Sequence, residues 1–183
     1  SMISPLAARE AMEPVLESGD DVLYVGLSGG VSGTCWGVSV VAQELRERFP
    51  DRDIRVFDSL GASLGEGLLA LEAAHLAQQG ADMETNVARL MVLRSKMRQL
   101  FMVDDLKYLR RGGRISSTSA VFGTMLSIKP VLHVDNEGHL INVGKARGRK
   151  ASIQAMAKKV AELGAGFDNA TMFISHGDCP EDA

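Results

Sequence analysis

The sequence predicts an α/β protein of two domains, a parallel doubly wound sheet domain followed by a smaller α+β domain. Two observations lead to this prediction. In the first 80 residues, short apolar stretches alternate with amphipathic helical stretches, which is typical of a parallel sheet covered by helices. After Gly80, two apolar stretches follow each other around a turn, which indicates an antiparallel hairpin. We therefore expect domains at residues 1–80 and 81–183.

The elements of the first domain follow from periodicity and turn residues. We expect helices at 7–17, 34–48 and 63–79, and strands at 22–27 and 54–57. Ser63 and Glu66 form a capping-box pattern at the start of the third helix, and Gly80 is expected to end it. In parallel sheets ligands bind beyond the carboxyl ends of the strands, and Ser28 and Asp58 both lie at such ends.

The second domain is predicted to mix helices with antiparallel strands. We expect helices at 84–98, capped by Asp82, then at 104–111, 119–126 and 149–163. Strands are expected at 100–103, 128–134, 139–145 and 171–175, and residues 135–138 form the hairpin turn. The second domain is therefore expected to be built around that hairpin.

Composition limits the classes of function. The chain has 183 residues and a net charge of −3, which gives no general attraction to nucleic acid or to a membrane surface. No stretch is long and apolar enough to span a bilayer. Cys35 and Cys179 lie far apart and match no metal-binding spacing, so we expect a reduced, cytoplasmic protein without metal or cofactor. The sequence begins Ser-Met and stops just after a predicted strand, so we expect truncation at both ends.

The loop from Ser28 to Thr34 is the strongest candidate for a binding site. It joins a buried strand to a helix, where backbone N–H groups and the helix dipole attract an anion. Its glycines allow close approach, and the hydroxyls of Ser28, Ser32 and Thr34 are further donors. We expect a phosphate or carboxylate site here, and the alternative is a tight strand-to-helix turn with capping serines.

Cations and a late histidine are further candidates. Arg114 lies beyond Gly112-Gly113, so the dipole of the preceding helix explains its position less well than it explains cations inside that helix. A second cluster lies at the start of a predicted helix, where the dipole disfavours positive charge; it consists of Lys145, Arg147, Arg149 and Lys150. These cations are either solvated or paired with an anionic partner. His176 follows the last predicted strand and precedes a glycine, as a ligand-contacting histidine does, and the alternative is a structural histidine, which is the more common case.

Two enzyme classes also match parts of the glycine loop. Gly26-Leu27-Ser28-Gly29-Gly30 fits the G-x-S-x-G elbow of serine hydrolases, with His176 as base and Asp135 or Asp58 as acid. A nucleotide-binding enzyme is the other class, since the loop is similar to the S-G-G-x-D-S loop of ATP pyrophosphatases. The loop of this chain has Ser32 in place of the aspartate of that motif. A nucleotide-binding enzyme would also require an adenine pocket and a metal-binding carboxylate near Asp58. A Walker loop is excluded because no Gly-Lys-Ser/Thr is present.

Several segments of the chain match, in order, the motifs of one protein family. The loop at 27–34 is similar to that family's S-S-x-L-S-G-T, and Asp58 to Gly67 is similar to its D-S-x-x-x-S-x-G-x-G. The most specific match is Val103-Asp104-Asp105-Leu106-Lys107-Tyr108-Leu109-Arg110-Arg111-Gly112-Gly113-Arg114-Ile115-Ser116. At suitable intervals there follow Ile128-Lys129-Pro130, Gly138, Lys145-Ala146-Arg147-Gly148 and Ser175-His176. With these segments the chain resembles the DegV family of bacterial fatty-acid-binding proteins.

The resemblance implies a non-enzymatic protein that holds a long-chain fatty acid between its two domains. It assigns the carboxylate to the serine loop (Ser28, Ser32, Gly33 and Thr34), to Arg114 and to His176. It further implies a partner, a fatty acid kinase that phosphorylates the bound acid, and the cluster from Lys145 to Lys150 is a candidate docking surface for it. Family members begin with a further segment that ends in Thr-Ser, of which Ser1 matches the serine.

Overall fold

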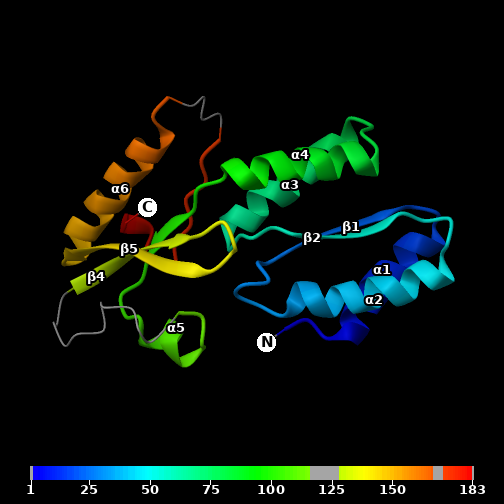
Figure 1. The fold of residues 1–183 in the computed structure, drawn as a ribbon, viewed down its shortest axis with the longest axis horizontal. Helices are drawn as coiled ribbons and strands as arrows, with labels where there is room; N and C mark the ends of the chain where they lie inside the picture. Colours follow the sequence, from blue (N-terminus) through cyan, green and yellow to red (C-terminus); the bar gives the residue numbers. More distant parts are fainter. Residues whose placement is uncertain (1, 116–127, 167–170, 183) are drawn as a thin grey trace. The chain divides into compact units, whose positions relative to one another are not determined.

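The computed structural model describes residues 2–115, 128–166 and 171–182, which form helices and short sheets (Figure 1). The chain divides into two compact units, Ser1–Met97 and Arg98–Ala183. This division falls later than the expected boundary near Gly80, because helix α4 (Met83–Lys96) packs with the first unit. Its Leu90 is fully buried in a cluster with Phe57 and Leu69.

The first unit is built on a parallel pair of strands, β1 (Val22–Gly26) and β2 (Ile54–Asp58). Helices α1 (Pro5–Glu17) and α2 (Thr34–Arg48) cover one face, and α3 (Leu64–Gln78) and α4 cover the other (Figure 1). Alternate strand residues point to opposite faces, so Val22, Tyr24, Ile54 and Val56 pack against the α1–α2 layer, and Leu23, Val25 and Phe57 against the α3–α4 layer. The predicted parallel α/β arrangement is confirmed.

Side-chain caps explain where α1 and α4 begin. Ser4 caps α1, with its hydroxyl oxygen accepting the Ala7 N–H, and the Asp82 carboxylate accepts the Thr85 N–H at 2.8 Å, as predicted for α4. The capping box predicted at Ser63 is wrong. Ser63 has a φ of 51°, whereas a capping residue has extended backbone angles, and its side chain makes no cap hydrogen bond.

The second unit contains the predicted hairpin. Strands β4 (Ile128–Val134) and β5 (Leu140–Arg147) pair antiparallel, and β3 (Leu100–Met102) adds to the other side of β4. The turn between β4 and β5 is fixed by the Asp135 carboxylate, which accepts the N–H groups of Glu137 and His139. Helix α6 (Arg149–Gly164) packs against the sheet (Figure 1).

Buried residues Leu106, Ile115 and Leu132 form the core of the second unit, beside helix α5 (Lys107–Arg111). The strand predicted at 171–175 is wrong, because these residues pair with no strand in the described ranges, and an extended segment needs a partner strand. The predicted helix at 119–126 lies outside the described residues. A short 3₁₀ turn follows at Pro180–Asp182.

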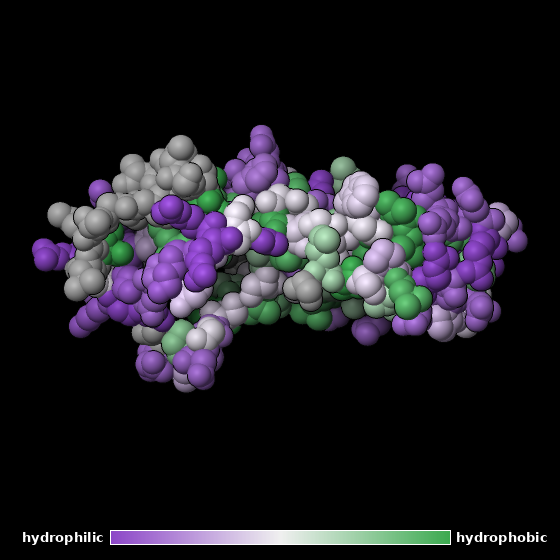
Figure 2. Space-filling model, turned by 90° about the horizontal axis from the view of Figure 1, so that it is seen from below, coloured by the Kyte–Doolittle hydropathy of each residue, from purple (hydrophilic) through white to green (hydrophobic). Residues whose placement is uncertain are grey.

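The surface mixes hydrophobic and hydrophilic residues, as the face in Figure 2 shows. On the first unit, exposed large apolar side chains include Met2, Leu6, Trp36 and Val40. Among the described helices, none has the length and apolar character needed to cross a bilayer.

Gly26 provides a test of the first core. A Cβ at Gly26 would lie 2.4 Å from Tyr24 Cε1 and 2.6 Å from Cys35 Sγ, so Gly26→Ala must displace the ring or the helix. We expect the free energy of unfolding to fall by about 1–3 kcal/mol in urea titrations. Gly37→Ala is the matched control, because it lies inside α2 with no heavy atom within 4 Å of the added Cβ. It should stabilise by about 0.5–1 kcal/mol, and equal effects of the two changes would contradict this packing.

Candidate functional site

Two loops meet at the carboxyl ends of β1 and β2. The strands end in register, Gly26 beside Asp58, so the loops that follow them start at the same edge. Hydrogen bonds join the loops: the Ser28 N–H donates to Gly61 O at 2.8 Å, the Gly29 N–H to Asp58 Oδ2 at 2.9 Å, and the Ser59 N–H to Gly26 O at 3.1 Å. The loop after β1 is therefore shaped by the loop after β2.

The Asp58 carboxylate braces both loops. Its Oδ2 accepts the Gly29 N–H, and its Oδ1 accepts the Leu60 N–H at 2.9 Å. Position 29 must be glycine for this, because an added Cβ would lie 2.6 Å from Oδ2. Leu60 has a φ of 47°, a left-handed conformation that costs energy and that the brace helps to hold.

Arg94 of α4 holds the main chain of Asp58, and the sequence did not predict this role. Its Nη1 donates to the Asp58 carbonyl oxygen at 2.7 Å, and its guanidinium carbon lies 4.9 Å from the centroid of the Phe57 ring. Nothing in the sequence distinguishes it from Arg89 on the same helix, whose Nε pairs with Glu72 at 3.0 Å.

Ser28 organises the serine loop from inside. Its side chain is fully buried, its Oγ accepts the Gly30 N–H at 3.1 Å, and its carbonyl oxygen accepts the N–H groups of Val31 and Ser32. These contacts give Ser28 a role in the shape of the loop. A direct contact of Ser28 with a ligand stays a prediction.

Ser32 and Thr34 form a hydroxyl pair at the start of α2. Their oxygens lie 2.9 Å apart, and Ser32 Oγ also accepts the Thr34 N–H at 3.2 Å. Each of the two hydroxyl groups has one proton. One of these protons forms the hydrogen bond between the two oxygens, and the other is available to donate to a ligand, whichever group donates within the pair. In the described part of the chain, the N–H groups of Gly33 and Cys35 have no hydrogen-bond acceptor. Together with the positive end of the helix dipole, these donors suit an anion.

Burial holds two groups near this site, the Cys35 thiol and the Glu66 carboxyl, toward their neutral forms by raising their pKa. Burial, with smaller contributions from Asp58 and Glu66, raises the pKa of Cys35 to about 11. Burial also raises the pKa of Glu66. Cys35 is thus a protonated thiol at neutral pH, donating to Leu27 O at 3.4 Å, and not a nucleophile.

These contacts do not favour the two enzyme interpretations. A nucleophile must reach its substrate, and the Ser28 side chain has no exposed surface. Both Asp58 oxygens are occupied by backbone N–H groups, and the described residues contain no cluster of three potential metal ligands.

In the second unit, Arg114 is placed by the end of α5. Gly113 has a φ of 71°, its N–H donates to Arg110 O, and the Arg114 N–H donates to Leu109 O at 2.9 Å. This is a Schellman motif, which requires the left-handed conformation that glycine supplies. The Gly-Gly-Arg sequence therefore sets the position of an exposed arginine.

His176 and the basic cluster also lie in the second unit. His176 Nδ1 accepts the Cys179 N–H at 3.2 Å, which leaves Nε2 to carry the ring proton when the ring is neutral. Within the cluster, Lys145, Arg147 and Lys150 are exposed. Arg149 is partly buried and donates to Asp104 Oδ1 at 2.8 Å, so it has an anionic partner inside the chain.

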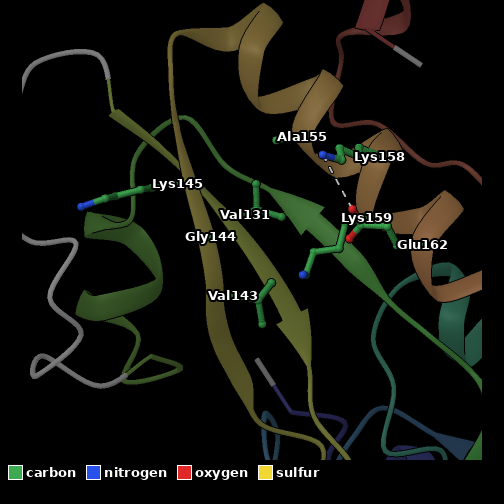
Figure 3. A pocket seen from close by; sticks show the side chains of 8 residues that line it. All are labelled: Val131, Val143, Gly144, Lys145, Ala155, Lys158, Lys159 and Glu162. Atoms are coloured by element: carbon green, nitrogen blue, oxygen red, sulfur yellow. Dashed lines mark ion pairs between the residues drawn. The ribbon is translucent and has the colours of Figure 1, made fainter.

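A cavity of about 220 Å³ lies between β4, β5 and α6. Its lining includes Val131, Val143, Lys145 and Lys159, and Figure 3 shows the Lys145 side chain pointing away from Lys159. Lys158 at its rim pairs with Glu162 at 3.9 Å. The cavity is smaller than the usual 300–1,000 Å³ of ligand pockets, so we do not assign a long acyl chain to it.

The brace can be tested with Asp58→Asn. Asparagine has one acceptor oxygen, so one of the Gly29 and Leu60 N–H groups loses its partner, and we expect the free energy of unfolding to fall by about 1–3 kcal/mol. Amide hydrogen exchange at Gly29 or Leu60 should accelerate. Asp53→Asn is the control, since Asp53 pairs with Arg55 beside the opposite end of β2 and a surface pair contributes about 0.2–1 kcal/mol. Unchanged hydrogen exchange at the Gly29 and Leu60 amides would contradict the role of Asp58 in holding the two loops.

Comparison with known proteins gives the family. The family model described as "Uncharacterised protein, DegV family" matches residues 1–183. The chain is 38% identical over its 183 residues to the DegV domain-containing protein CPE0026 of Clostridium perfringens, and it covers 63% of that protein.

Two solved structures have the same fold. A DegV family protein from Thermus thermophilus, described by its fatty acid binding, is 36% identical with a TM-score of 0.80, over 91% of this chain and 57% of that one. DegV of Bacillus subtilis, described as a fatty acid binding protein, is 33% identical with a TM-score of 0.75, over 88% of this chain and 56% of that one. The chain spans less than two thirds of the length of these relatives. The family model matches the whole sequence, and the chain therefore belongs to the DegV family.

Proposed function

We propose that this protein binds a long-chain fatty acid without chemically changing it, with the carboxylate at the loop from Ser28 to Thr34. The observation that carries the proposal is the Ser32–Thr34 hydroxyl pair, which keeps one proton for an anion at the start of α2. Charge-assisted hydrogen bonds of this kind are stronger than neutral ones. The fatty acid binding described for relatives that are 33% and 36% identical supports the same function.

The proposal gives the loop residues different roles. The Ser32–Thr34 pair donates its one spare hydroxyl proton to the carboxylate, the Gly33 N–H is a second donor, and Ser28 holds the loop that carries them. Arg114 and His176 are the further carboxylate ligands that the family resemblance assigns. Arg114 supplies a fixed positive charge, and the His176 ring supplies an Nε2–H donor.

Ser32→Ala and Thr34→Val test the carboxylate site. Each change removes the spare hydroxyl proton or the group that orients it, so we expect the Kd for palmitate to rise about 10- to 100-fold, as for loss of one hydrogen bond to a charged group. Isothermal titration of the delipidated full-length protein measures the Kd. Lipid extraction of the purified protein should also yield a C14 to C18 acid.

Ser39→Ala is the matched control, because the Ser39 hydroxyl bonds to Cys35 O inside the same helix. It should leave the Kd unchanged. A wild-type protein that binds no fatty acid, and that hydrolyses p-nitrophenyl esters through Ser28, would contradict the proposed function. If Ser32→Ala and Thr34→Val both bind palmitate with the wild-type Kd, the proposed fatty acid binding stands, and the proposed carboxylate site at this loop is contradicted.

We further propose that the protein presents its bound acid to a fatty acid kinase in the cytoplasm. The two free thiols suit a reducing compartment. The exposed cations Lys145, Arg147 and Lys150 form the proposed docking surface, since rim charges of this kind steer an acidic partner. Arg149 was predicted to belong to this surface, but its ion pair with Asp104 makes it less available.

Charge reversal tests the docking surface. In the doubly substituted protein Arg147→Glu, Lys150→Glu, we expect acyl phosphate formation with the kinase to fall at least about tenfold, because like charges then face the partner. The Kd for palmitate should not change. Lys158→Glu, on an exposed turn of α6, is the control. Equal loss of lipid binding and of kinase coupling would contradict a separate docking role.

A further inference from the structure

The cavity of the second unit is shaped by a break in the pairing of β4 and β5. Its volume is about 220 Å³, and residues of β4, β5 and α6 line it. Next to the Val131–Gly144 pair, Val143 is an extra residue that the register of the two strands skips. In a regular strand, consecutive side chains alternate between the two faces, but here residues 143, 144 and 145 all line the cavity. The bulge therefore helps to open the cavity, and bulges often lie beside functional sites.

Small residues keep the cavity open from both sides. Gly144 of β5 has no side chain, and Ala155 of α6 has only a methyl group. A Cβ at Gly144 would lie 3.7 Å from Val131 Cβ, which is ordinary contact, and the φ of Gly144 is outside the left-handed region. A larger residue would therefore fit at position 144 and fill space that close-packed protein interiors seldom leave empty. The floor of this space is apolar and consists of Val131, Val143 and Ala155.

One positive charge at the cavity lacks a counter-ion. Lys159 reaches from α6 toward the strands (Figure 3), is half-buried, and has no hydrogen bond or ion pair with any residue that the structure describes. The charge of Lys158 is offset, since its Nζ lies 3.9 Å from Glu162 Oε1. Lys145 points away from Lys159. An anion in the cavity would thus be held mainly by Lys159, at a partly sheltered position where attraction between charges is stronger than in bulk water.

We propose that this cavity binds a small amphipathic carboxylate, whose apolar part lies on the floor of the cavity and whose carboxylate accepts a hydrogen bond from the Lys159 ammonium. A volume of about 220 Å³ equals about seven water molecules at ~30 Å³ each, which is the size of a ligand such as benzoate. Inorganic phosphate is a poorer match, because it makes no use of an apolar floor and loses more hydration. The site lies within the second unit and is separate from the proposed fatty acid site at the serine loop.

A ¹⁹F NMR titration with 4-fluorobenzoate tests the proposal on the full-length protein saturated with palmitate, which fills the proposed fatty acid site. We expect saturable binding with a Kd on the order of 1 mM, as for a ligand with few atoms. The neutral 4-fluorobenzyl alcohol should bind at least about tenfold more weakly, because it lacks the charge-assisted hydrogen bond. Inorganic phosphate should not displace the probe, and the Kd should be the same without palmitate.

Variants of the lining locate the probe. Lys159→Met should raise the Kd at least about tenfold, as for loss of one hydrogen bond between charged groups. Lys150→Met is the matched control, because it removes the same charge from the same helix outside the cavity, and it should leave the Kd unchanged. Gly144→Leu should fill the cavity and abolish binding. Ala155→Leu fills it from the helix side, so it decides the same point if Gly144→Leu folds poorly.

Three results would overturn the proposal. One is the absence of saturable 4-fluorobenzoate binding to the wild-type protein. Another is an equal Kd for Lys159→Met and Lys150→Met, or normal binding by a folded cavity-filling variant. The third is displacement of the probe by palmitate, which would place the probe at the fatty acid site. Failure of palmitate to bind would contradict the proposed function alone, since the titration without palmitate still tests the cavity.

Discussion

The carboxylate of Asp58 is the constraint on which the candidate site depends. Parallel strands bring their carboxyl ends to one edge, and main-chain hydrogen bonds from Ser28 to Gly61 and from Ser59 to Gly26 begin to join the loops beyond them. Asp58 adds a side-chain tie by accepting one N–H from each loop, while Arg94 holds its main chain. The serine loop is therefore held in one shape before any ligand arrives, and preorganisation of this kind lowers the cost of binding.

Charged residues in the second unit serve two purposes that their sequence positions do not separate. Asp104 binds Lys129 and Arg149 and so connects the segment after β3, strand β4 and the start of α6. Lys145 and Arg147, two residues apart on β5, are exposed. A basic stretch can thus combine internal supports with solvated charges, and ion-pair geometry is what distinguishes them.

Local patterns were sufficient for most of the elements and insufficient for the long-range contacts. Periodicity and turn residues gave the β1–α2–β2 unit, the β4–β5 hairpin and the Asp82 cap, and motif order gave the family. The Ser63 cap failed because the β2–α3 turn imposes a positive φ, and the strand at 171–175 failed because an apolar stretch does not specify its partner. Arg94 and Arg149 act on residues 36 and 45 positions away, so no local pattern could reveal their roles.

The parallel pairing of β1 and β2 also links the site to the folding of the first unit. The paired residues Val22 and Ile54 are 32 positions apart, so α2 and both flanking loops must be enclosed before the two strand ends meet. The donors of the serine loop come together only when that closure is complete. An anion that binds them therefore stabilises the closed, paired state against unfolding by mass action, and its concentration in the cell sets how much of the unit's stability comes from the ligand.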